Sequence, residues 1–305
     1  MRKIIIWIEA MRLRTLPVSL AGVMAGVAMA LMYPGPRQFS LITAILCVTF
    51  ALLAQIASNF ANEYFDYVGG IDRRGREGPR RGVTEGDITP RAMLIATWSA
   101  LALAGCAGLG IAWIGGWWLI AVGICVAVGV FAYSAGPYPL SHHALGEIAV
   151  VVFYGIVPVT FTHYVLTGRF AVEALWTSIA FGLMGANVLI VNNYRDRDDD
   201  WAVKKRTLAV VAGRRFCAYL YLINGVLAFF IMTGILSCWT SANSTNATAA
   251  VWLARTPYFY ILLHILLFSL LTRREGARLT TLLGMTASLM AAFALAIIIL
   301  LVATV

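Results

Sequence analysis

Long runs of apolar residues, separated by turn signals or by charges, recur along the whole chain. Most of these runs have the length, about 17–25 residues, that an α-helix needs to cross a bilayer. They predict nine spans, at residues 16–33, 40–60, 92–113, 117–133, 147–166, 172–193, 216–237, 253–271 and 281–303. The third and fourth spans meet at Gly115-Gly116, so a very tight turn must join them.

The fifteen residues before the first predicted span carry basic side chains on both sides of a short apolar run, and no small-residue cleavage site follows. This pattern favours a retained helix that lies in the membrane interface over a signal peptide that is removed.

The composition agrees with a membrane protein. Of the 305 residues, 61% are hydrophobic and only 12% are charged, whereas a soluble domain has about half and about a quarter. The water-soluble and disordered classes are therefore excluded. We expect residues 1–305 to form a single domain, an all-α integral membrane protein in which about nine transmembrane helices surround a central cavity.

The charges predict the orientation in the membrane. The chain has 23 Lys+Arg against 14 Asp+Glu. All of the Lys and Arg residues except Arg37, Arg169 and Arg255 fall in the segments that lie on the same side as the N-terminus. Cytoplasmic loops carry such an excess, so the N-terminus should be inside and the C-terminus outside. This distribution explains the net charge without a nucleic-acid partner. The five cysteines form no CxxC pair and indicate neither a disulfide framework nor a zinc site.

Half of the acidic residues lie in two groups, at the inner ends of the second and sixth spans. In the first group, Asn59, Asn62, Glu63 and Asp66 share one side of a helix, and Asp72 follows a glycine pair. In the second group, side chains spaced four apart form one stripe: Asn192, Asp196 and Asp200.

Amide and carboxylate oxygens suit Mg²⁺. This ion binds few carboxylates, and water and substrate phosphates complete its coordination shell. Basic side chains follow both groups, among them Arg81, Arg195 and Lys205. Acids with a metal on one side and cations on the other fit a diphosphate. The alternative is that these acids form a solvated rim of loops, paired with the basic residues in salt bridges. The presence of two matching groups of Asn and acidic residues makes this alternative the weaker one.

These motifs resemble those of the UbiA-type intramembrane aromatic prenyltransferases, in particular the branch that prenylates 1,4-dihydroxy-2-naphthoate for menaquinone synthesis. The resemblance covers most of the chain and rests on Arg12-Leu-Arg14-Thr15-Leu16-Pro17, Asn59 to Asp72, Gly78-Pro79-Arg80-Arg81-Gly82, Gly86-Asp87-Ile88-Thr89, Tyr133 to Pro137, Leu145-Gly146-Glu147, Asn192 to Asp200, Lys205 and Thr207-Leu208. Two positions depart from the family pattern, because Glu63 and Glu147 stand where relatives usually have Asp.

The resemblance implies a UbiA-type prenyltransferase fold with both motifs facing each other near the cytoplasmic side. It implies Mg²⁺ held by Asn62, Glu63, Asp66, Asn192, Asp196 and Asp200, with Asp66, Asp196 and Asp200 as catalytic residues. The expected substrate-binding residues are Lys205, Arg195, Arg81, Asp72, Tyr133 and Asn59. Tyr133, Tyr154 and Tyr194 are candidates to shield an allylic cation, and no histidine receives a role.

The implied reaction transfers a polyprenyl group from its diphosphate to 1,4-dihydroxy-2-naphthoate with loss of CO₂, which gives demethylmenaquinol. The prenyl tail should leave through a gap between helices into the lipid. The expected location is a bacterial cytoplasmic (inner) membrane, with the mouth of the site cytoplasmic and with no obligatory protein partner.

Three alternatives remain. A phytyl donor or a 4-hydroxybenzoate acceptor would make the chain another enzyme of the same type. A cation-coupled secondary transporter also uses paired acids, but its acids usually lie near the midplane, and here they lie at one end of the spans.

Overall fold

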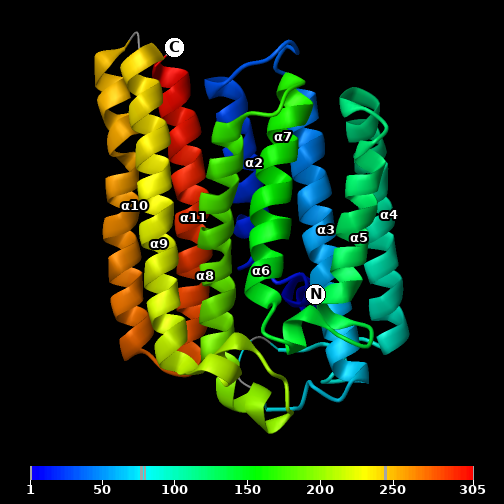
Figure 1. Cartoon of the computed structure of the whole chain (residues 1–305). Coiled ribbons are helices and arrows are strands. Elements are labelled where there is room, and N and C mark those ends of the chain that lie inside the picture. The colour runs from blue at the N-terminus through cyan, green and yellow to red at the C-terminus, as the bar shows by residue number, and fades with distance from the viewer. Residues whose placement is uncertain (1, 76–77, 79, 244–245, 305) are drawn as a thin grey trace.

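The computed structural model describes residues 2–75, 78, 80–243 and 246–304. In this part of the chain the regular structure is helical (Figure 1). The elements are α1 (Arg2–Ala10), α2 (Leu16–Met32), α3 (Leu41–Val68), α4 (Pro90–Gly115), α5 (Leu119–Ser134), η1 (Leu140–His142), α6 (Gly146–Val150), η2 (Val151–Ile156), α7 (Val157–Thr167), α8 (Val172–Ala202), α9 (Leu208–Asn243), α10 (Ala247–Arg273) and α11 (Ala277–Thr304).

The prediction of about nine spanning helices is confirmed. Seven helices of the described chain are long and apolar enough to cross a membrane, counting α6, η2 and α7 as one span, and α2 and α5 are shorter apolar helices. Gly116 has a φ of 119° and makes the tight turn between α4 and α5, as the glycine pair predicted. Short α1 precedes the first long helix, and Ile4, Ile5 and Ile8 remain exposed on it.

Two helices extend further inward than the apolar runs indicated. Helix α3 continues from residue 60 to Val68, and α8 continues from residue 193 to Ala202. These extensions contain the acids of both motifs except Asp72, which lies beyond the end of α3. The spacing that we read as helical is therefore helical in the structure, and those acids are carried by helix ends rather than by loops.

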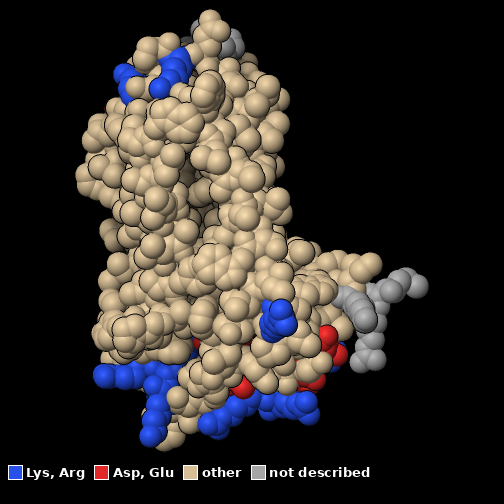
Figure 2. All heavy atoms as spheres, turned by 90° about the vertical axis from the view of Figure 1, so that its right-hand side faces the viewer, with Lys and Arg blue, Asp and Glu red and all other residues tan. Residues whose placement is uncertain are grey.

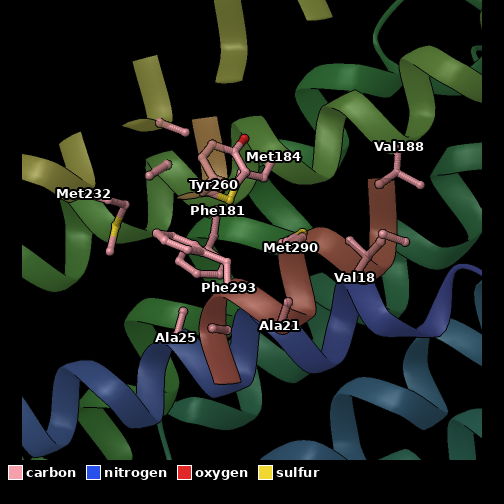
Figure 3. Close-up of a cluster of buried hydrophobic side chains, with 14 of the residues drawn as sticks. Val18, Ala21, Ala25, Phe181, Met184, Val188, Met232, Tyr260, Met290 and Phe293 are labelled. Atoms are coloured by element: carbon pink, nitrogen blue, oxygen red, sulfur yellow. The ribbon is translucent and has the colours of Figure 1, made fainter. Parts of the chain in front are cut away.

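The two sides of the bundle are packed differently. Helices α2, α8, α9, α10 and α11 share one continuous buried apolar cluster, part of which Figure 3 shows: Phe181 and Met184 of α8 meet Tyr260 of α10 and Phe293 of α11. The side formed by α3, α4 and α5 has only small separate clusters. The cavity of the bundle lies beside these three helices.

The span formed by α6, η2 and α7 contains one turn of π-helix, Val151–Ile156. Pro158 stands just after it and has no N–H to donate, which disturbs the regular hydrogen-bond ladder. At Gly155 this segment touches α8 so closely that a Cβ would lie 2.4 Å from the Cα of Gly182. The glycine pair thus allows backbone contact between two helices, as small residues do in membrane proteins.

Buried polar groups within the tightly packed side satisfy one another. Asn224 donates to the side chain of Asn187, which donates to the carbonyl of Tyr221. The His264 ring stacks on the Tyr221 ring, and its Nε2 lies 3.1 Å from the same carbonyl. Paired in this way, polar groups are tolerated in a bilayer, and His264 acts as a packing residue.

Figure 2 shows Lys and Arg side chains concentrated at the lower end of the bundle and a smaller basic group at the upper end. The lower end is the one that contains the N-terminus and the ends of α3 and α8 that carry the acidic motifs (Figure 1).

Candidate active site

A cavity of about 640 Å³ lies between α2, α3, α4, α5, α7 and α8. Both acidic motifs contribute to its lower end, where the lining includes Asn62, Asp66, Asn192, Asp200 and Lys205. The two motifs are more than 100 residues apart in the chain, so it is the fold that brings them to one cavity. Figure 2 faces the α4–α5 side of the bundle and shows it hollowed at mid-height.

Asp66 is the centre of the polar contacts at this end, and it is only 1% exposed. Its Oδ2 accepts hydrogen bonds from Lys205 Nζ at 3.1 Å and from the Asn62 amide at 3.2 Å. Its Oδ1 lies 3.4 Å from His142 Nε2. Three elements thus converge on one carboxylate, which fits the rule that a buried charge is paired.

The turn between α8 and α9 directs Lys205 into the cavity. Lys204 has a left-handed φ of 60°, and the Lys205 backbone N–H donates to the Asp200 carbonyl at 2.8 Å. This turn reverses the chain directly after the second motif. The Lys205 side chain therefore lies beside Asp66 of the first motif.

In the second motif, Arg195 holds Asp196. The guanidinium donates to both carboxylate oxygens of Asp196, at 2.6 and 3.0 Å, to Asn192 Oδ1 at 2.9 Å and to the Thr280 hydroxyl. Asp196 is 2% exposed and is not among the residues that line the cavity. Arg195 thus holds the side chains of Asn192 and Asp196 in place on one face of α8.

Glu63 points away from the cavity. Its Oε1 accepts a hydrogen bond at 3.0 Å from the backbone N–H of Val83, in the connection between α3 and α4. In the same connection, Arg81 pairs with Asp72 at 3.4 Å. Arg81 lines the cavity, and its buried Nη1 has no hydrogen-bond partner among the described residues. Pro79 of the Gly-Pro-Arg-Arg-Gly segment lies outside the described residues.

Two other predicted substrate-binding residues, Asn59 and Tyr133, line the cavity. Asn59 also donates to the Met11 carbonyl at 2.9 Å, which ties α3 to the turn before α2. Tyr154 lines the cavity too, whereas Tyr194 packs against the apolar cluster of α8–α11.

Three residues near the motifs were missed from the sequence. His142 faces Asp66, Ser134 accepts a hydrogen bond from Asn62 at 3.0 Å, and Arg12 donates to Asn62 Oδ1 at 2.6 Å. Each belongs to a segment that contains resemblance motifs, but their contacts depend on the tertiary fold. Arg12 had a visible signal, because it stands in the Arg12–Pro17 motif.

The donor set fits Mg²⁺ rather than a preformed metal cage. Among the described residues no three His, Cys, Asp or Glu side chains converge as a metal site. Asp66, Asp200 and the amides of Asn62 and Asn192 line the cavity instead. Few carboxylates with amide oxygens are what Mg²⁺ uses when water and substrate phosphates complete its shell.

Beyond the motifs the cavity is apolar on one side. Its lining from α4 and α5 contains Gly105, Leu109, Gly123, Ile124 and Ala127. A Cβ added at Gly105 or Gly123 would meet no atom within 4 Å. These two glycines leave open space between helices whose outer faces carry exposed Leu103 and Val128, as expected for a surface against lipid.

The chain is similar to proteins of one known family. The sequence profile of the UbiA prenyltransferase family matches residues 19–278. The chain is 37% identical to a 1,4-dihydroxy-2-naphthoate octaprenyltransferase of Mycobacterium tuberculosis over 76% of this chain and 80% of that one. It is 34% identical to the Escherichia coli protein of the same name, over 76% and 78% of the two chains.

The fold resembles that of solved UbiA homologues. A homologue from Archaeoglobus fulgidus bound to DMAPP and Mg²⁺ matches with a TM-score of 0.63 and 15% identity, covering 94% of this chain and 98% of that one. The apo structure of a homologue from Aeropyrum pernix matches with a TM-score of 0.68 and 15% identity, over 94% and 97%.

Proposed function

Since the chain belongs to the UbiA prenyltransferase family, we propose that it transfers a polyprenyl group from a polyprenyl diphosphate to 1,4-dihydroxy-2-naphthoate, giving demethylmenaquinol. The observation that carries the proposal is the convergence of two acid–amide motifs and Lys205 on the polar end of an otherwise apolar cavity. The curated relatives named above support the choice of acceptor and of a polyprenyl donor.

The diphosphate of the donor binds at the lower end of the cavity. Lys205 and the unpartnered Nη1 of Arg81 donate to its oxygens. Asn62, Asp66, Asn192 and Asp200 would hold Mg²⁺, which would supply positive charge that stabilises the departing diphosphate. Asp196 is held by Arg195 and Glu63 by the Val83 N–H, and neither lines the cavity. Asp72 holds Arg81 by their ion pair, and Arg195 keeps Asp196 in place.

The bond changes balance without an added reactant. The C–O bond of the prenyl diphosphate breaks and its electron pair leaves with the diphosphate. The ring carbon that carries the carboxylate bonds to the allylic carbon. The bond to the carboxylate then breaks, its electron pair returns to the ring, and CO₂ leaves. The chain's task is to bind both substrates, to keep them aligned and to exclude water from the cation.

Two inner loops meet at the lower end. The Arg206 N–H donates to the His142 carbonyl at 3.2 Å, which joins the α5–α6 connection to the turn that carries Lys205. We propose that this end faces the cytoplasm of a bacterium, that the N-terminus lies on the same side in the inner membrane, and that the C-terminus lies outside.

Transfer in detergent micelles tests the proposal. Purified protein is given octaprenyl diphosphate, 1,4-dihydroxy-2-naphthoate and Mg²⁺, and the lipid product is identified by mass spectrometry. We expect demethylmenaquinol, with product lost on chelation by EDTA and restored by added Mg²⁺. Parallel reactions replace the donor with phytyl diphosphate or the acceptor with 4-hydroxybenzoate; transfer only to 4-hydroxybenzoate would overturn the assigned acceptor. Product formation that EDTA leaves unchanged would contradict the metal site.

The α4–α5 wall should set the tolerance for long donors. An isoprenoid tail fits the apolar space beside Gly105 and Gly123, and a Leu at either position would project into that space. We expect Gly123→Leu and Gly105→Leu to lower octaprenyl transfer by about tenfold or more while geranyl transfer stays near that of the wild type. The measurement is the ratio of kcat/KM for the two donors.

The matched control for the tail prediction is Gly234→Leu. Gly234 lies on α9, away from the cavity, and a Cβ there also meets no atom within 4 Å. This variant should keep the wild-type ratio. Equal losses with both donors in the α4 and α5 variants would place the tail elsewhere.

A further inference from the structure

The polar stripe of α3 extends deeper into the cavity than a diphosphate site needs. Gln55, Asn59, Asn62 and Asp66 follow one another at steps of four, three and four residues, so they share one face of the helix. All four line the cavity. Gln55 stands seven residues before Asn62, which places it about 10 Å further into the membrane.

The facing wall of α8 has no such extension. Beyond Asn192, the cavity lining from α8 consists of Gly185, Val188 and Leu189. The wall from α4 and α5 is apolar except for Tyr133 of α5. The α2–α3 side is polar at this depth, where Thr15, just before α2, and Ser19 of α2 join the lining, and η2 adds Tyr154.

On this side, two buried polar atoms have no hydrogen-bond partner within the part of the chain that the structure describes: Gln55 Oε1 and Arg12 Nε. Gln55 is 5% exposed, and its amide nitrogen already donates to the Thr15 carbonyl at 2.8 Å. One terminal nitrogen of Arg12 donates to Asn62. The two residues therefore present one free acceptor and one free cationic donor.

A hydrocarbon tail would leave these atoms unsatisfied, which is costly inside a membrane. An aromatic acid with a ring hydroxyl satisfies both, because its hydroxyl donates to an amide oxygen and its carboxylate accepts from a guanidinium. Resting on the function proposed above, we infer that Arg12 and Gln55 form the acceptor site: Arg12 binds the carboxylate, Gln55 binds a ring hydroxyl, and the prenyl tail lies on the opposite wall.

The turn that carries Arg12 is held firmly. Arg12 has a left-handed φ of 54°, and its carbonyl accepts from the hydroxyl of Thr15 at 2.9 Å. Asn59 and Gln55 bind the Met11 and Thr15 carbonyls on either side. Gln55 therefore also has a structural contact, and the experiment must separate that contact from ligand binding.

Two fluorescent naphthalenes separate the roles without turnover. 1-Hydroxy-2-naphthoate has both the hydroxyl and the carboxylate, whereas 1-naphthol has only the hydroxyl. Binding of each to the purified full chain in micelles is measured by its own fluorescence. We expect the wild type to prefer the naphthoate, and Arg12→Gln to weaken naphthoate binding by about ten- to hundredfold while naphthol binding changes little.

Gln55→Met keeps the side-chain length and should weaken both probes, leaving their affinity ratio at the wild-type value. The matched control is Arg14→Gln, because Arg14 is exposed two residues away; this variant should bind both probes as the wild type does. If Gln55→Met changes the ratio of naphthoate affinity to naphthol affinity, Gln55 supports the turn that carries Arg12. That result would overturn its role in binding the ligand.

An Arg12→Gln variant that keeps the wild-type preference would overturn the carboxylate site. The same holds if it raises the KM for the prenyl diphosphate and leaves naphthoate binding unchanged. Probe binding with the expected pattern in a protein that transfers no prenyl group would keep the acceptor site and reject the proposed reaction, so the two failures are distinguishable.

Discussion

Asp66→Asn is expected to lower prenyl transfer by at least about 10²–10³-fold, the loss seen when one preorganised electrostatic group is removed from an active site. The carboxylate of Asp66 is buried and faces Lys205, Asn62 and His142 at once. An amide there removes a charge from the proposed Mg²⁺ site and leaves the Lys205 ammonium without its counter-charge. The measurement is single-turnover transfer at saturating donor, acceptor and Mg²⁺.

The control for Asp66→Asn is the same substitution at Asp198. The Asp198 side chain is 68% exposed and pairs with Arg197 and Arg214 at the surface, where ion pairs contribute little. Asp198→Asn should transfer at the wild-type rate. A comparable loss in both variants would mean that the overall charge at this end of the bundle, rather than the site, controls the rate.

Loss of folding must be separated from loss of chemistry. An unpaired buried lysine is strongly destabilising, so Asp66→Asn is also expected to unfold at a lower temperature. Adding Lys205→Met removes the unpaired charge and should recover stability without recovering transfer. Activity of the single variant within tenfold of the wild type would reject the role of Asp66.

Gly155→Ala is expected to cause a large loss of stability. Its Cβ would lie 2.4 Å from the Cα of Gly182 and 2.5 Å from the Ser178 carbonyl oxygen. Both are backbone atoms of α8, so no side chain can move aside. Overpacking costs about 1–3 kcal/mol where side chains yield, and we expect the upper end of that range or more, measured by thermal unfolding in micelles.

The matched control is Gly234→Ala, since its added methyl group meets no atom within 4 Å and the midpoint of unfolding should not fall. An unchanged midpoint for Gly155→Ala would show that η2 and α8 separate more easily than the backbone contact indicates. We also expect Gly155→Ala to lower transfer, because η2 carries Tyr154 and Phe153 of the cavity wall.

The helices were readily predicted from the sequence. A spanning helix is specified locally, by the length of its apolar run and by the charged or turn residues at its ends. The inner ends of α3 and α8 were placed too early because polar residues end a hydropathy signal without ending a helix. The i, i+3 and i+4 spacing of the acids already indicated that the helix continues.

The candidate site was only partly predictable. Residues that share a helix face, such as Asn62 and Asp66, could be grouped from their spacing. The direction of Glu63 could not, because its partner is a backbone N–H in a connection with no regular structure. His142 was also out of reach, since the approach of its loop to Asp66 depends on how α5, α6 and α8 pack.

The Asp66–Lys205 contact joins residues 139 positions apart, and this distance has a consequence for biosynthesis. Asp66 leaves the ribosome and reaches the membrane surface while its counter-charge is still untranslated. The nascent chain therefore holds an uncompensated acid at the end of α3 until α8 and its turn have been inserted. Assembly of the pocket is therefore a late event in the synthesis of the chain.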